Sequence, residues 1–376
     1  MTKIRLAVVS DAVKPFHDGG KETRIDEIIK RLGRDLDVEV HTMRWWGTGG
    51  RKDVAGIRHR ALCRLHPMYR GERRALPQAL LFAAATFRML FRRFDVLEAD
   101  AVPVLQIFTL RLVTWVRRRP LVVTWHEVWG AAYWRQYLGR LGVLAGLAEK
   151  LALGLPDRIV CPSEGTAVRV REAIGDQKSV VVVPNGIDLD QIAAAPVAPS
   201  AADVVFVGRL IAHKNVDALI RAMALLHRDG SATTCAVIGG GPEEQRLAAL
   251  ATELGLGDRV RFLGRLPSSG DVLAQLKGAA VFCSLSEREG FGIAALEAMA
   301  CGLPVIAYDH PDNHARTFLA DDVNCRLVTG LEPRTVADAI RDAIRDRARL
   351  SAAARETARA YSWDAVAASM AQVYAP

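Results

Sequence analysis

The stretch DVVFVGRLIAHKN, residues 203–215, opens with an apolar, β-branched run and closes with a loop that carries cations. The run over 203–208 has the length and composition of a buried parallel strand, and a helical pattern follows it. The same alternation continues downstream, with predicted strands over TTCAVIG at 233–239, VRFLG at 260–264, VFCSL at 281–285 and PVIAY at 304–308. Strands that alternate with helices predict a doubly wound parallel sheet.

The chain upstream of this stretch shows the same alternation. Its predicted strands are IRLAVVS at 4–10, VEVHTM at 38–43, LVVTW at 121–125, RIVCPS at 158–163 and VVVP at 181–184. The segment AAAPVAPSAA at 193–202 has two prolines, small residues and no period, which indicates a linker. We therefore predict an α/β protein with two doubly wound Rossmann-like domains that face each other across a cleft, where ligands of such sheets bind.

Composition supports this organisation. The chain has 376 residues, of which 50% are hydrophobic and only 6% aromatic, which suits two domains with helices packed on sheets. The net charge of +8 is concentrated in the N-terminal half, in clusters at 73–74, 92–93 and 117–119. These clusters could meet an anionic membrane, a phosphorylated acceptor or only water. No nucleic-acid-binding motif accompanies them, so nucleic acid is not expected as a partner.

Features at the start of the chain and in its apolar runs predict the compartment. MTKIRLAVVS enters a strand pattern without the apolar stretch and cleavage site of a signal peptide. The longest apolar run, 79–91, is interrupted by Arg88 and is short of the ~20 residues that span a bilayer. Six cysteines lie far apart in apolar runs, as expected of reduced core residues. We expect a cytoplasmic protein, with possible peripheral contact at the inner face of the membrane.

The segment EGFGIAALEAMAC at 289–301 carries the first candidate chemistry. Gly290 and Gly292 allow close approach of the backbone, and the helix that follows can hold a phosphate at its N-terminus. Glu289 lies just before this helix and Glu297 no more than about 12 Å further along it, which matches the extent of a sugar nucleotide. An ordinary amphipathic helix with exposed glutamates would show the same spacing.

A second candidate loop follows the strand at 203–208. Arg209 and Lys214 converge on this loop, and Asn215 is the expected helix cap. Two fixed cations can stabilise a departing diphosphate without a metal ion. The alternative is a solvated loop.

Three motifs in this order resemble the family-4 glycosyltransferases of GT-B fold: VPNGID at 183–188, GRL-x3-KN at 208–215, and Glu289-x7-Glu297. The resemblance implies a retaining enzyme that uses a nucleotide-diphosphate sugar. It also implies a division into an acceptor-binding domain over 1–192, a linker over 193–202 and a nucleotide-sugar-binding domain over 203–358. A C-terminal helix over 359–376 is expected to cross back to the N-terminal domain.

The resemblance also assigns roles to single residues. Arg209 and Lys214 are expected to grip the diphosphate, Glu289 to contact the donor sugar and Glu297 to receive the ribose hydroxyls. The pair Gly19–Gly20 and His126 match family positions near the donor, although a glycine pair is otherwise a turn signal and a histidine a packing residue. The expected catalytic residues are His126, Arg209, Lys214 and Glu289, and the expected donor-binding set adds Gly19, Gly20, Gly208, Gly240, Gly241, Gly264, Leu266, Gly290, Phe291, Gly292 and Glu297.

The nucleotide and the acceptor are less defined. IGGGPEE at 238–244 lets the backbone approach the nucleotide, and the resemblance places it near the ribose and base. UDP is the expected nucleotide, with GDP next. Indole rings could stack on an acceptor sugar or could pack under loops; the candidate acceptor residues are His17, Trp45, Trp46, Glu127 and Trp129. The acceptor could be a lipid-linked glycan or a small natural-product scaffold.

No metal or other cofactor is expected, because the candidate loops lack the aspartate pairs that hold Mn²⁺ under a diphosphate. By resemblance, the acceptor hydroxyl would attack from the face of the leaving group, and the β-phosphate would take its proton. Two alternatives stay open: a sugar-nucleotide epimerase of the same architecture, and a non-catalytic protein that binds a nucleotide sugar.

Overall fold

The computed structural model describes residues 3–70, 73–175 and 178–375. The chain divides into two compact units, one formed by residues 1–185 and 363–376 and the other by 186–362. The boundary at Asn185 falls before the expected linker over 193–202, and a short helix, α7 (Leu189–Ala194), covers the first part of that segment. The second boundary lies at Ser362 rather than at the expected 358. The VPNGID motif therefore straddles the junction, with its first residues in unit 1.

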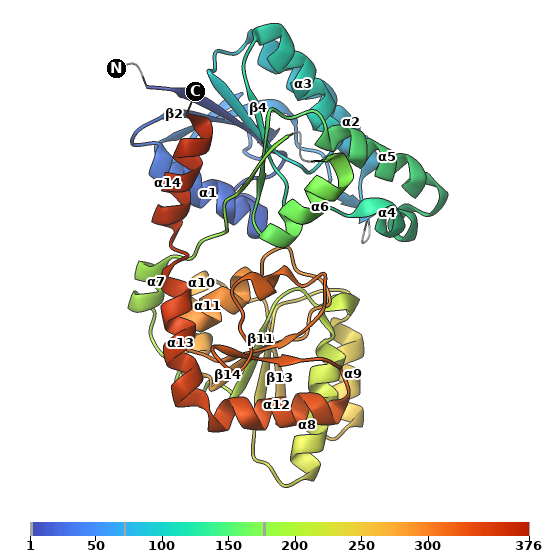
Figure 1. Cartoon of the computed structure of the whole chain (residues 1–376), viewed down its shortest axis with the longest axis vertical. Helices are drawn as coiled ribbons and strands as arrows, with labels where there is room; N and C mark the ends of the chain where they lie inside the picture. The colour runs from blue at the N-terminus through green and yellow to red at the C-terminus, as the bar shows by residue number, and fades with distance from the viewer. Residues whose placement is uncertain (1–2, 71–72, 176–177, 376) are drawn as a thin grey trace. The chain divides into compact units, whose positions relative to one another are not determined.

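Unit 1 is built on an eight-stranded sheet in the order β10-β9-β8-β7-β1-β2-β4-β3, which is parallel except for β3 (Figure 1). Its strands are β1 (Arg5–Val9), β2 (Asp37–Arg44), β3 (Arg51–Val54), β4 (Ile57–Arg64), β7 (Val96–Asp100), β8 (Leu121–Thr124), β9 (Arg158–Cys161) and β10 (Ser179–Val182). A separate two-stranded ribbon joins β5 (Tyr69–Arg70) and β6 (Arg73–Arg74). The sequence prediction missed β7 because this central strand, VLEAD, holds two acidic residues that hide its buried character.

Helices cover both faces of the unit 1 sheet. They are α1 (Gly20–Leu32), α2 (Leu76–Ala85), the 3-10 helix η1 (Thr86–Phe91), α3 (Leu105–Arg117), α4 (Gly130–Leu138), η2 (Gly139–Leu141), α5 (Gly142–Leu153), α6 (Glu164–Ile174) and α14 (Trp363–Tyr374). The C-terminal helix α14 packs on α1, and Trp363, Met370 and Tyr374 are buried in the same apolar cluster as Ile25 and Ile29. Burial of these large apolar side chains holds the end of the chain on unit 1.

Unit 2 contains an all-parallel six-stranded sheet in the order β13-β12-β11-β14-β15-β16. The strands are β11 (Val204–Val207), β12 (Cys235–Ile238), β13 (Val260–Gly264), β14 (Val281–Ser284), β15 (Val305–Tyr308) and β16 (Cys325–Val328). The remaining helices of this unit are η3 (Ala212–Lys214), α8 (Val216–Arg228), α9 (Glu244–Glu253), α10 (Ser269–Gly278), α11 (Ile293–Ala300), η4 (His314–Thr317), α12 (Pro333–Arg345) and α13 (Arg347–Arg359). Both expected doubly wound sheets are thus confirmed.

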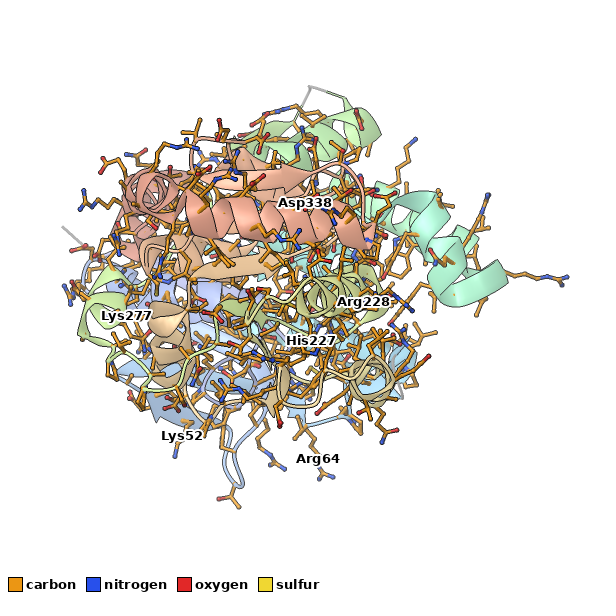
Figure 2. All side chains as sticks on the ribbon, turned by 90° about the horizontal axis from the view of Figure 1, so that it is seen from below. Lys52, Arg64, His227, Arg228, Lys277 and Asp338 are labelled. Carbon is orange, nitrogen blue, oxygen red and sulfur yellow. The ribbon has the colours of Figure 1, made fainter. Side chains whose placement is uncertain are left out.

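The surface helices of unit 2 are conventional amphipathic helices. On α12, Val336 and Ile340 are buried against the sheet, whereas Asp338 projects outward and pairs with Arg334 and Arg341 (Figure 2). Arg228, at the end of α8 and labelled in the same view, is exposed as well, and its Nε donates to the carbonyl of Ala224 at 3.4 Å. This polar outer surface is what a helix that borders water requires.

The strand orders locate the switch points of the two sheets. In each sheet the first strand lies between a strand that follows it directly in the sequence and one that comes later, as in the 3-2-1-4-5-6 order of a dinucleotide-binding fold. The switch point of unit 1 lies between β1 and β7, and that of unit 2 between β11 and β14. Ligands of such folds bind beyond the carboxyl ends of these strands.

Candidate functional site

The unit 2 candidate site lies at this switch point, where the loop after β11 meets the loop after β14. Lys214, on η3, donates from Nζ to Oε1 of Glu289. Ser286, which is fully buried, donates from its hydroxyl to the same oxygen at 3.1 Å. Glu289 therefore accepts two hydrogen bonds from two different loops, one of them charge-assisted.

Backbone hydrogen bonds hold these two loops together. The amide of Glu287 donates to the carbonyl of His213 at 3.0 Å, and the side-chain Nδ2 of Asn215 donates to the carbonyl of Leu285 at 3.0 Å. Asn215 occupies the N-cap position of α8, as expected, but it has a left-handed φ of 50° and its side chain makes no cap hydrogen bond. Its side chain is used instead to tie the Lys214 loop to the Glu289 loop.

A third segment fixes the backbone of Glu289. Its amide donates to the carbonyl of Asp312 at 3.1 Å, and its carbonyl accepts from the amide of His314 at 2.9 Å. Because both backbone groups of Glu289 are paired, its carboxylate is presented from a rigid position.

A pocket of about 130 Å³ opens beside this ion pair. Its lining includes Gly208, Lys214, Ser284, Glu289 and Gly292. Gly292 adopts φ +90° directly before α11, and a Cβ there would lie 2.8 Å from Cβ of Ala315. The position therefore requires glycine, and it turns the chain so that the unpaired N–H groups at the start of α11 can face an anion.

The glycine loop after β12 packs directly on the loop that carries Arg209. A Cβ on Gly239 would lie 1.9 Å from the carbonyl oxygen of Gly208, and one on Gly241 would lie 2.3 Å from that of Leu210. The amide of Gly239 also donates to the carbonyl of Gly264 at 2.8 Å. The predicted donor residues Gly208, Gly240, Gly241 and Gly264 are thus brought together, next to the partly buried Leu266.

The other predicted donor residues differ in their surroundings. Arg209 is exposed on its loop, and Glu297 is partly exposed on α11. Phe291 is buried, with its ring 5.3 Å from that of Phe318 and 5.8 Å from that of Tyr361. Its ring therefore packs the core under the motif, and Gly290, beside it, has only backbone to offer a ligand.

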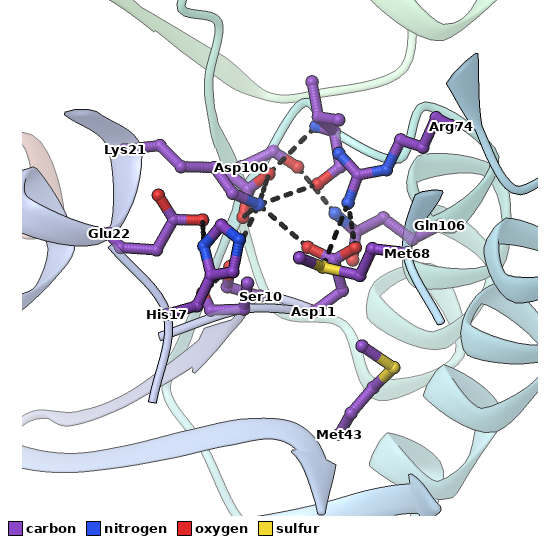
Figure 3. Close-up of polar contacts among 12 residues, drawn as sticks. Ser10, Asp11, His17, Lys21, Glu22, Met43, Met68, Arg74, Asp100 and Gln106 are labelled. Atoms are coloured by element: carbon purple, nitrogen blue, oxygen red, sulfur yellow. Dashed lines mark hydrogen bonds and ion pairs between the residues drawn. The ribbon is translucent and has the colours of Figure 1, made fainter. Parts of the chain in front are cut away.

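In unit 1, a buried cluster of charged side chains lies at the switch point (Figure 3). Asp11 follows β1 and Asp100 ends β7, and both are almost fully buried. Nζ of Lys21 lies 2.8 Å from the carboxylate of Asp11 and 3.2 Å from that of Asp100. Arg74 pairs with the second oxygen of Asp11, to which Gln78 also donates at 3.0 Å. Two buried carboxylates and two cations thus neutralise one another.

The electrostatics of this cluster follow from burial and charge. Burial acts to raise the pKa of Asp11, but Lys21 and Arg74 outweigh it and hold that pKa below its usual value. Burial raises the pKa of Asp100, and Lys21 only partly opposes this. Burial alone would lower the pKa of Lys21, yet the carboxylates of Asp100 and Asp11 raise it instead. The sequence analysis missed this cluster because its charged residues come from four separate segments of the chain. The signal that could have indicated it is the pair of acidic residues, Asp11 and Asp100, at the ends of two strands.

Gly19 and Gly20 lie at the exposed start of α1, directly before Lys21. A Cβ on Gly19 would lie 2.3 Å from the carboxylate of Glu22, which also lies 3.1 Å from Nδ1 of His17. The glycine pair thus opens a helix whose first turn is crowded with polar side chains. The backbone N–H groups there are oriented as an anion site requires.

His126 follows β8, as predicted, and its imidazole is neutral at pH 7. Burial, with the nearby charges of Arg24 and Lys21, lowers the pKa of His126 to about 3. Its Nε2 is buried and has no hydrogen-bond partner among the described residues. It lines a small cavity together with Thr124 and Asp100. A neutral imidazole with an unused nitrogen can exchange a hydrogen bond with a sugar hydroxyl, but it is not a general acid at this pH.

The predicted acceptor residues have different environments. Trp46 is buried, with its ring 6.0 Å from Phe16, so its faces are largely covered. Trp45 donates from Nε1 to the carbonyl of Asp11 at 3.0 Å, and its ring lies 5.8 Å from that of His17. His17 and Trp45 thus border the charged cluster, whereas the ring of Trp46 supports the loop.

Trp129 belongs to a separate aromatic group on α4. Its ring lies 4.7 Å from those of Tyr133 and Trp134. Its backbone amide donates to the buried carboxylate of Glu149 at 3.0 Å. Glu127, two residues earlier, is partly exposed at the end of β8.

Unit 1 also has a hollow away from its switch point. A wide hollow of about 1000 Å³ in unit 1 is lined by Ile4, Arg5 and Asp37, at the amino ends of the strands, where α/β sheets do not bind ligands. Within residues 3–70, 73–175 and 178–375, no group of three or more His, Cys, Asp or Glu side chains could hold a metal ion. The same residues include no helix long and apolar enough to cross a membrane.

Comparison with known proteins identifies related sequences. The family model described as glycosyl transferases group 1 matches residues 170–361, and that of glycosyltransferase family 4 matches residues 18–191. A D-inositol 3-phosphate glycosyltransferase of Geodermatophilus obscurus is 34% identical over 248 residues, which cover 61% of this chain and 54% of that protein. A GDP-mannose-dependent alpha-(1-6)-phosphatidylinositol monomannoside mannosyltransferase of Mycobacterium tuberculosis is 31% identical over 245 residues, which cover 57% of this chain and 60% of that protein. The matched part is thus little more than half of each relative.

Solved structures share the fold. Sucrose-phosphate synthase from Thermosynechococcus elongatus has a TM-score of 0.80 at 22% identity, with 99% of this chain and 98% of that one covered. The Anabaena protein HepE, in complex with UDP and glucose, has a TM-score of 0.74 at 20% identity, with 98% and 99% covered. These similarities confirm the predicted GT-B fold of two Rossmann-like domains.

Proposed function

This chain belongs to the glycosyl transferases group 1 family, of the family-4 type and GT-B fold, and on that premise we propose that it is a retaining hexosyltransferase. In this proposal it transfers a sugar from a nucleotide-diphosphate sugar to an acceptor hydroxyl. The observation that carries it is the Lys214–Glu289 pair beside the pocket at the start of α11. Lys214 supplies positive charge for the diphosphate, and Glu289 supplies a carboxylate for sugar hydroxyls.

The leaving group is stabilised without a metal ion. Lys214 and the start of α11 line one pocket and place positive charge there, and the exposed Arg209 directly follows its lining residue Gly208. As the bond from the anomeric carbon to the β-phosphate oxygen breaks, negative charge builds on that oxygen. The ammonium group of Lys214 is already held in place by Glu289, and Glu289 is held by Ser286. The positive charge therefore needs little rearrangement when the bond breaks.

We take retention from the resemblance to family-4 enzymes, and the mechanism proposed for it uses no nucleophile of the enzyme. Glu289 is committed to Lys214 and Ser286, which suits a binding role better than attack on the sugar. The acceptor hydroxyl then forms its bond to the anomeric carbon on the face that the phosphate leaves, and its proton passes to the phosphate oxygen. His126, held neutral, would contribute a hydrogen bond to a substrate hydroxyl rather than a proton.

UDP is the proposed nucleotide and GDP the next choice. HepE was solved with UDP and with UDP-glucose, whereas the mycobacterial relative is named for GDP-mannose. The relatives are named for two kinds of acceptor, inositol 3-phosphate and a phosphatidylinositol mannoside. We propose an acceptor of one of these classes, a small phosphorylated or natural-product scaffold or a lipid-linked glycan. The described unpaired cysteines, most of them buried, support a cytoplasmic location.

The test is a thermal-shift screen of nucleotide sugars, followed by incubation of the best donor alone and with acceptors. We expect one donor to raise the melting temperature, and NMR of the product to show the donor's anomeric configuration. An inverted product would contradict retention, and conversion of the donor to an epimer without acceptor would show an isomerase. Binding of the donor without turnover in the presence of any tested acceptor would indicate a non-catalytic protein.

A further inference from the structure

Unit 1 exposes many more large apolar side chains than unit 2 does. Among the described residues, Val197 and Val323 are the exposed large apolar side chains of unit 2. In unit 1 such side chains recur along α2, η1, α3 and α5; examples are Leu80, Phe91, Leu112, Trp115, Leu144 and Leu147. Scattered single residues of this kind are ordinary, but a concentration on neighbouring helices marks an interaction surface.

These helices are apolar on both of their sides. On α3, Leu110 and Val113 are buried against the sheet, whereas Leu112 and Trp115 face outward, with Trp115 73% exposed. On η1, Met89 is buried, and Phe91 is 86% exposed. Their outer sides therefore differ from that of α12, which presents ion pairs to water.

The helices that carry these side chains neighbour one another. Helix α3 contacts α2, η1 and α5, and Figure 1 shows α2, α3 and α5 side by side on unit 1. A hollow of about 630 Å³ at α2 and η1 is lined by Leu81, Phe87, Leu90 and Phe91, together with Arg88. We call the outer surface of α2, η1, α3 and α5 the apolar-basic face.

Its charge is almost entirely positive. The four helices contain the basic residues Arg88, Arg111, Arg117 and Lys150 and one acidic residue, Glu149, which is buried. Arg93 and Arg118, in the connections, are exposed. The nearest acidic side chains at the end of α3, Asp157 and Asp95, are paired with Arg111 and Arg119 respectively.

We propose that the apolar-basic face lies in the headgroup region of an anionic phospholipid bilayer, with Phe91, Trp115 and Leu144 inserted among the acyl chains. Exposed aromatic and aliphatic side chains supply apolar burial, and arginines meet lipid phosphates. A second copy of the chain fits this face less well, because a symmetric contact would set arginine against arginine without acidic partners. This inference rests on the proposed function in one respect: it selects a lipid-linked acceptor, which lies at the bilayer surface.

The experiment is co-sedimentation of the full chain with vesicles of phosphatidylcholine, with and without phosphatidylglycerol. We expect binding to the anionic vesicles that falls as salt is added. The double variant Phe91→Ser, Trp115→Ser should bind about 100-fold more weakly, since it loses two inserted side chains. The variant Arg93→Gln, Arg117→Gln should lose most of the preference for anionic lipid. The matched control Val197→Ser, Val323→Ser should bind like the parent chain.

Two further measurements separate this inference from the proposed function. Glu289→Gln should bind vesicles normally, and the Phe91, Trp115 variant should keep its thermal shift with the best donor and its circular dichroism spectrum. The inference is overturned if the chain fails to bind anionic vesicles at low salt, or if the double variant binds like the control. A dimer in sedimentation velocity that the double variant abolishes would also overturn it, in favour of a contact between two copies.

Discussion

Lys214 and Glu289, which lie 75 positions apart in the chain, form an ion pair beside the start of α11. Two loops that follow neighbouring strands at the switch point are joined by this pair. A nucleotide-diphosphate sugar that enters the pocket would meet the cation and the carboxylate together, already oriented by Ser286 and the backbone of Asp312.

Removal of Lys214 should therefore lower turnover strongly. We expect Lys214→Ala to reduce kcat/KM by roughly 100- to 1000-fold, as loss of one preorganised charge-stabilising group does in other enzymes. The exposed Lys52, in unit 1, provides the control, and Lys52→Ala should be neutral. Steady-state kinetics with the best donor measure both. Full activity of Lys214→Ala would remove the main support for the proposed function.

Gly292 should not tolerate a side chain. We expect Gly292→Ala to lower the free energy of unfolding by about 1–3 kcal/mol, because its φ is +90° and the added Cβ would clash with Ala315. Gly257, which has open space around it, is the matched control, and Gly257→Ala should cost far less. Chemical denaturation measures the difference. Equal stability of the two variants would contradict the geometry at the start of α11.

The buried cluster in unit 1 should depend on Asp11. Asp11→Ala leaves Lys21 and Arg74 without a shared partner, and we expect a loss of roughly 3–5 kcal/mol in the free energy of unfolding. Asp18, whose side chain is 83% exposed, supplies the control variant Asp18→Ala. Urea unfolding compares them. A small effect at Asp11 would mean that water replaces the carboxylate.

His126 should make the protein less stable in acid. Its pKa is lowered to about 3 in the folded chain, so between that value and the ordinary pKa of ~6.5 the unfolded chain binds the extra proton. Stability linked to His126 is thus present above pH 6.5 and is lost as the pH falls below it. We expect the free energy of unfolding to fall between pH 7 and pH 5 in both proteins, and to fall by roughly 1–2 kcal/mol less in His126→Gln than in the parent chain. Parallel losses in both proteins would show that His126 does not titrate in this way.

Metal removal should leave activity intact. In the proposed mechanism, Arg209, Lys214 and the N-terminus of α11 supply the charge that a divalent ion would otherwise provide. We expect the transfer rate to be unchanged after dialysis against EDTA and unchanged again when Mn²⁺ is added. A rate that disappears with EDTA and returns with Mn²⁺ would show that the leaving group needs a metal.

Much of the unit 2 site could be predicted because its residues lie in local patterns. Gly208, Lys214, Glu289 and Gly292 each follow a recognisable strand within a few residues, and parallel strands deliver their carboxyl ends to one edge. The unit 1 cluster could not be predicted in this way. Asp100 belongs to a central strand, β7, whose acidic residues hide its apolar pattern. Arg74 comes from a short ribbon that is distant from β1 in the sequence.

The sequence by itself determined the class of fold, the two sheets and the loops that carry the candidate donor residues, because alternation of apolar runs and the positions of glycine act over short distances. Only the tertiary structure decided which side chains are covered. It buried Phe291 and Trp46 under their loops, gave Asn215 a loop-tying role, and left Phe91 and Trp115 exposed. The physical reason is that burial depends on which distant segments pack against a residue, and no local pattern specifies that partner.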